Sequence, residues 1–161
     1  MLVSLAARPM DLVLATCQGI GLALASGAIA GALAGALGAR GSTALGTVLI
    51  ALGAILGAFL LGEFLTHEDH PAWPGWPIGA LIALLGSYVG REIVVGAAAR
   101  TESGGSTATV AVYVILAAAA VAGLSLVLPP VGLIALLVVA WLAISRRRRA
   151  ARKHEGLRVL R

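Results

Sequence analysis

The sequence predicts an all-α fold, a polytopic transmembrane helical bundle with about five spans. Hydrophobic residues make up 60% of the 161 residues and charged residues only 12%, whereas soluble domains carry charge on about a quarter of their residues. The mean hydropathy is +0.99. The apolar residues gather in runs close to the roughly 20 residues that a membrane-spanning helix needs. The predicted spans are residues 11–38, 43–62, 78–99, 107–128 and 131–145.

The first apolar run, 11–38, is long for one span at about 1.5 Å of rise per residue. We predict one tilted helix, with a hairpin broken at the glycines as the alternative. The choice decides the side of the N-terminus, because a hairpin adds one crossing. The polar segment 40–42 ends the run.

The second run, 43–62, is followed by a polar segment with two histidines, two adjacent acidic residues and three prolines. Because proline lacks an amide hydrogen, these prolines are expected to exclude a regular helix there. Trp73 and Trp76 in this segment are expected at the headgroup level, where amphipathic aromatic rings concentrate. The third run, 78–99, begins directly after the last of the prolines.

The last two runs are separated by Pro129 and Pro130. A single helix over residues 107–145 would be nearly 60 Å long at about 1.5 Å per residue, twice the thickness of the hydrocarbon layer. The proline pair therefore predicts a tight turn between two antiparallel helices, 107–128 and 131–145.

Positive charge predicts the orientation of the chain. We assign residues 1–145 to one transmembrane domain and residues 146–161 to a basic tail, which should be cytoplasmic because basic segments stay on that side. Five spans then place Arg40 and Arg100 on the cytoplasmic side and Glu63 outside. The expected location is the plasma membrane, with a multi-pass topology.

The tail begins with four consecutive arginines, Arg146, Arg147, Arg148 and Arg149. They are expected to bind anionic lipid headgroups, a contact worth about 1 kcal/mol per basic residue near the surface. Nucleic acid is not an expected partner, because the tail has no aromatic residues on which bases could stack.

Small residues at a spacing of four mark flat helix faces that allow close approach of a second helix. Two uses remain open from the sequence, namely packing within the chain and formation of a homo-oligomer. The glycines concerned are Gly27, Gly31 and Gly35 in the first span, Gly53 and Gly57 in the second, and Gly86 and Gly90 in the third.

Arg91 and Glu92 are the most informative charged residues, because a charge within a span costs a few kcal/mol and is rarely incidental. Neighbouring residues of a helix point about 100° apart, so the two side chains should face different surroundings. With Glu63 they are our candidates for a transport or ion site. The alternative is that both lie at the interface and pair with Arg100 or lipid headgroups.

His67 and His70 are weak candidates for metal ligands in the acidic segment that follows the second run. Imidazole and carboxylate groups can bind a divalent metal, but no further histidine or cysteine nearby completes a closed site. We therefore predict no metal and no cofactor. The chain also lacks a nucleophile–base pair, a phosphate loop and a dinucleotide fingerprint, so it is not predicted to be an enzyme.

Two stretches carry a resemblance to a known family. The glycine-rich segment 21–27 and the ending 153–161, which follows the basic cluster, resemble a group of small bacterial membrane proteins catalogued as domain of unknown function 4126. Glu63-Phe64 also lies where that family has an acidic–aromatic pair. The resemblance implies a helical protein of the bacterial inner membrane, and it supplies no activity.

Two functions follow as hypotheses. The first is a transporter or channel for an ion or small solute, acting as a homo-oligomer and based on the charges inside the third span. The second is a non-transporting structural or assembly protein that acts through its glycine-faced helices.

Overall fold

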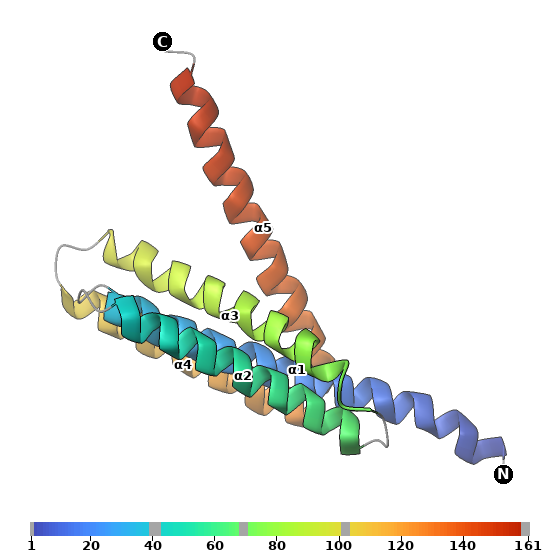
Figure 1. Ribbon diagram of the computed structural model, residues 1–161. Coiled ribbons are helices and arrows are strands. Elements are labelled where there is room, and N and C mark those ends of the chain that lie inside the picture. Colours follow the sequence, from blue (N-terminus) through green and yellow to red (C-terminus); the bar gives the residue numbers. More distant parts are fainter. Residues whose placement is uncertain (1, 39–42, 68–70, 101–103, 159–161) are drawn as a thin grey trace.

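The computed structural model describes residues 2–38, 43–67, 71–100 and 104–158 (Figure 1). Within these ranges the chain forms five helices, each long and apolar enough to cross a membrane, which confirms the predicted fold class. The helices are α1 (Leu2–Gly38), α2 (Thr43–His67), α3 (Gly75–Ala98), α4 (Gly104–Val127) and α5 (Pro130–Arg158).

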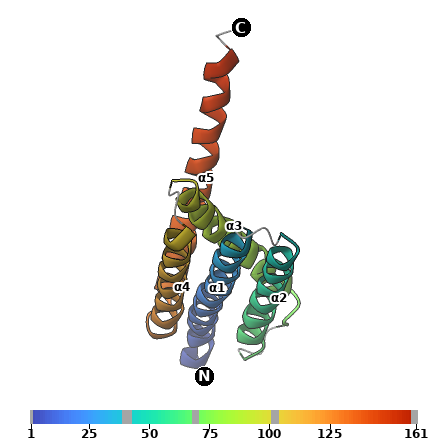
Figure 2. The same ribbon diagram turned by 90° about the vertical axis from the view of Figure 1, so that its left-hand side faces the viewer.

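Helix α1 is continuous, so the first run is one candidate span and the hairpin alternative for it is wrong. Its candidate span, Met10–Gly38, has 29 residues. Figure 2 shows α1 between α2 and α4, with α3 packed beside it. It is the most buried span at 56% of its most apolar window, against 11% for α5. Helix α1 is continuous over its glycines although glycine has a low helix propensity.

Helix α2 extends past the predicted end at residue 62 and reaches His67. The added turn places Glu63 on the helix, and the Thr66 hydroxyl donates a hydrogen bond of 3.0 Å to the Gly62 carbonyl. Helix α3 begins at Gly75, before the predicted start at residue 78. The expectation that the prolines exclude a helix was wrong for Pro77, which lies in the first turn, where the missing amide hydrogen removes no helical bond.

The predicted turn at the proline pair is present between α4 and α5. The Val131 amide donates to the Leu128 carbonyl at 2.9 Å, which closes the turn. Helix α5 then runs without a break from Pro130 to Arg158, so residues 146–158 of the basic tail continue the fifth span as one helix. Its C-terminal half diverges from the other helices and extends clear of them (Figures 1 and 2).

The interior is built from small and branched apolar side chains around α1. One buried cluster joins Ala23, Leu24, Leu61 and Ile82 from α1, α2 and α3. A second cluster joins α1, α3 and α4 through Ala32, Val94 and Ala111. Large apolar side chains such as Ile55, Phe59 and Leu116 are exposed on the outer faces, as expected for surfaces in contact with lipid.

Candidate functional site

The glycines of α1 and α3 face one another and bring the two backbones together. A Cβ atom placed on Gly27 or Gly31 would overlap the backbone of Ala83 or Ser87 on α3. In the reverse direction, a Cβ on Gly90 would lie 2.6 Å from the Ala28 carbonyl oxygen. Such contacts allow dispersion attraction over a long stretch of backbone, which is the main attraction between helices in lipid.

Gly35 and Gly86 of the pattern also make contacts within the chain. A Cβ on Gly35 would lie 3.1 Å from Cβ of Val94, and one on Gly86 would meet the Leu24 carbonyl oxygen at 2.5 Å. Both contacts join α1 and α3. In the part of the chain that the structure describes, these glycine faces are therefore occupied by neighbouring helices of the same molecule.

Helices α1 and α2 meet along a line of small residues that we call the α1–α2 seam. Its contacts run from Gly19 against Leu61, through Ala23 against Gly57 and Ala30 against Gly53, to Ala34 against Gly46. A Cβ on Gly53 would lie 2.6 Å from Cβ of Ala30. The middle of the seam is thus closed by direct contact between small side chains and backbone.

A cavity of about 310 Å³ lies at one end of the α1–α2 seam, and we call it the Glu63 cavity. Its polar lining consists of Gln18 from α1 and Glu63 and His67 from α2. His67 and Glu63 share a helix face because they are four residues apart, and Nδ1 of His67 lies 3.0 Å from the Glu63 carbonyl oxygen. Gln18 donates from Nε2 to the Leu126 carbonyl at 3.0 Å, which ties α1 to α4.

A smaller cavity of about 80 Å³ lies at the opposite end of the α1–α2 seam, and we call it the Arg91 cavity. Arg91 reaches it from α3, while Thr43 and Thr47 line it from α2. The Thr47 hydroxyl donates to the Thr43 carbonyl at 3.1 Å. Arg91 lies roughly 10 Å of helix before the end of α3 at Ala98.

The structure separates Arg91 from Glu92. Glu92 is exposed and lines neither of these two cavities. It stands four residues after Tyr88 and therefore shares that residue's face of α3. Three predicted site residues are thus divided among three places, with Glu63 and Arg91 at opposite ends of one seam and Glu92 on a different face.

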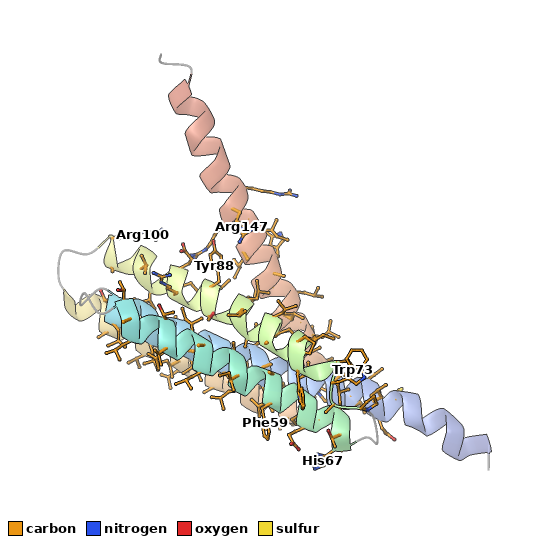
Figure 3. The ribbon with its side chains drawn as sticks, in the orientation of Figure 1. Phe59, His67, Trp73, Tyr88, Arg100 and Arg147 are labelled. Atoms are coloured by element: carbon orange, nitrogen blue, oxygen red, sulfur yellow. The ribbon has the colours of Figure 1, made fainter. Side chains whose placement is uncertain are left out.

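Figure 3 shows the two ends of the bundle, with His67 and Trp73 at one end and Arg100 at the far end of α3. Within the described residues, no group of three histidine, cysteine, aspartate or glutamate side chains could hold a metal ion. His70 lies outside the described residues, so the weak metal pair that includes it stays a prediction.

Arg147 of the basic tail makes one contact with an aromatic ring of the bundle. The guanidinium carbon of Arg147 lies 5.5 Å from the centroid of the Tyr88 ring, a cation–π contact between α5 and α3 (Figure 3). Arg146, Arg147 and Arg148 are all exposed, and the side chain of Arg149 is not among those that the structure describes.

Sequence reasoning missed Gln18 and Tyr88. Both are polar side chains inside apolar runs, and that property is the signal that could have drawn attention to them. Their partners on α4 and α5 are distant in the sequence.

The length and hydropathy of the helices identify a multi-pass membrane protein. Comparison with protein-family models, curated proteins and solved structures finds no match for the chain. The resemblance to domain of unknown function 4126 therefore stays an expectation.

Proposed function

We propose that this multi-pass membrane protein moves a small ion or solute along the α1–α2 seam. The observation that carries the proposal is the pair of cavities at the two ends of that seam, one lined in part by Glu63 and the other by Arg91. Along α1, Gln18 in the first cavity and Ala34 in the second are about 24 Å apart at 1.5 Å per residue. That separation is close to the roughly 30 Å thickness of the hydrocarbon layer.

The Glu63 cavity offers groups suited to a cation or a proton. A carboxylate, an imidazole and an amide carbonyl can each accept a hydrogen bond or attract positive charge. Arg91 and the threonine hydroxyls provide donors at the other end. The small residues between the cavities present smooth surfaces, so α1 and α2 can slide or part there with little side-chain rearrangement, as in shear motions of packed helices.

Flux into proteoliposomes tests the proposal. Glu63→Gln should lower proton or cation flux toward the level of empty liposomes, because it removes the carboxylate charge at the entrance. Glu92→Gln is the matched control, since it removes the same charge from a residue that lines neither cavity. Wild-type flux equal to that of empty liposomes would overturn the transport function. Equal losses in both variants would overturn the assignment of the seam as the path.

The orientation is part of the same proposal. We place the C-terminal basic segment and Arg100 in the cytoplasm of a bacterial cell, with the Glu63 cavity open to the outside of the inner membrane. Reporter fusions at Arg161 and in the segment 68–70 should give opposite sidedness. A periplasmic C-terminal reporter would contradict the orientation.

A structural or assembly role is the second candidate. It is favoured by the closed α1–α2 and α1–α3 contacts, together with the exposed apolar face of α2 that carries Ile55 and Phe59. Partner helices or further copies of the chain would bind that outer face, because Gly31 is already in contact with Ser87 of the same molecule. This role predicts a co-purifying helical partner, or a homo-oligomer, that is weakened by Phe59→Ala while the liposomes show no flux. Neither candidate assigns a catalytic reaction to the chain.

A further inference from the structure

The divergence of α5 from the bundle leaves a wedge-shaped cavity between α3 and α5, with a volume of about 440 Å³. Most of the side chains that line it are aliphatic, and the polar ones are Tyr88 and Arg147. The lining includes Leu81, Leu84 and Tyr88 from α3 and Ala143, Ile144 and Arg147 from α5. The wedge is separate from both cavities of the α1–α2 seam.

We propose that this α3–α5 wedge binds one anionic phospholipid, with its phosphate against Arg147 and an acyl chain between the leucines of α3 and the aliphatic residues of α5. Arg147 is the charged residue of the lining. Its guanidinium carbon lies 5.5 Å from the centroid of the Tyr88 ring. Among the described residues, no carboxylate forms an ion pair with Arg147. A guanidinium that lies on a ring face keeps N–H donors at its edge, where they match the oxygens of a phosphate.

The wedge combines an aliphatic lining with one charged residue, and this combination favours a phospholipid over a free phosphate. An acyl chain gains dispersion contacts along Leu84 and Ile144 but needs no hydrogen bonds there. A free phosphate would use only Arg147 and leave the aliphatic walls without a partner. The arginine-rich end of α5 lies in the cytoplasmic leaflet under our proposed orientation, and that leaflet is rich in anionic lipid. The inference narrows the general lipid contact of the basic segment to one site, and it does not depend on transport.

Native mass spectrometry of the full-length protein in detergent tests the site. The probes are phosphatidylglycerol, phosphatidylcholine with the same acyl chains, and soluble glycerol phosphate. We expect tighter binding of phosphatidylglycerol than of the other two. Arg147→Gln should weaken that binding about fivefold, which corresponds to the roughly 1 kcal/mol of one basic residue near anionic lipid. Arg148→Gln is the matched control, since Arg148 does not line the wedge, and we expect a smaller loss of phosphatidylglycerol binding than for Arg147→Gln.

A second pair of variants tests the apolar half of the site. Leu84→Trp adds bulk inside the wedge without changing charge, and it should weaken phosphatidylglycerol binding. Leu116→Trp is its control on the exposed face of α4. Equal losses for Arg147→Gln and Arg148→Gln would leave the basic segment as a diffuse lipid-binding surface and overturn the wedge site. Unchanged binding in Leu84→Trp, glycerol phosphate bound as tightly as the lipid, or a dimer that fills the wedge would each overturn it as well.

Discussion

The close approach of α3 to α1 makes Gly90→Ala an informative perturbation. The new Cβ would lie 2.6 Å from the Ala28 carbonyl oxygen, and ordinary van der Waals contact begins at 3.4 Å. The neighbouring atom is backbone, so α1 and α3 must separate by about 0.8 Å, the difference of those two distances. Forcing an extra methyl group into a packed interface costs about 1–3 kcal/mol. Because alanine is favoured over glycine in a helix by about 0.5–1 kcal/mol, we expect a net loss of up to about 2.5 kcal/mol.

The same helix contains a matched control. Gly96 has nothing within 4 Å of the position of a new Cβ, so Gly96→Ala keeps the propensity gain and adds no clash. Reversible unfolding in mixed micelles of mild detergent and dodecyl sulfate should show a lower free energy of unfolding for Gly90→Ala and an equal or higher one for Gly96→Ala. Equal stability of the two variants would refute the claim that backbone contact at Gly90 holds α3 to α1.

Two further substitutions probe the attachment of α4 and α5. Gln18→Met keeps the length of the side chain but removes the hydrogen bond to the Leu126 carbonyl, so the free energy of unfolding should fall by about 0.6 kcal/mol, the mean for such bonds in membranes. No change in unfolding would mean that the bond contributes nothing to the α1–α4 contact. Gly132→Ala places a methyl group on the Cys17 carbonyl, and hydrogen exchange of α5 amides should accelerate as the helix loosens. Gly123→Ala on α4, with open space around it, should leave that exchange unchanged, and similar exchange in both variants would contradict a tight α1–α5 contact.

The helix boundaries show where prediction from the sequence succeeded and where it failed. The proline pair 129–130 correctly predicted the turn between α4 and α5, because proline ends the backbone bonding of one helix and can begin the next. The end of α2 and the start of α3 were each displaced by about one turn. Hydropathy changes at the edge of the apolar run, whereas backbone hydrogen bonding continues into polar residues such as Glu63 and His67.

The candidate sites were predicted only in part. The different faces of Arg91 and Glu92 follow from the helical repeat alone. The cavity that Arg91 enters depends on the start of α2, which is remote from it in the sequence. Gln18 and Tyr88 likewise acquire their roles from Leu126 and Arg147, since a helix sequence reports which residues share a face but not which neighbour covers that face.

The sequence by itself therefore determined the fold class and the flat faces of α1, α2 and α3. It also determined the number of spans, except that a hairpin in the first run stayed open. These properties are local, because they depend on apolar length, proline position and the spacing of glycines along one helix. Only the tertiary structure decided that α1 is continuous and central, that Gly27, Gly31 and Gly35 contact α3 of the same chain, and that α5 diverges to open a wedge beside Arg147. These properties depend on which backbones approach one another, and that choice is made by the packing of all five helices together.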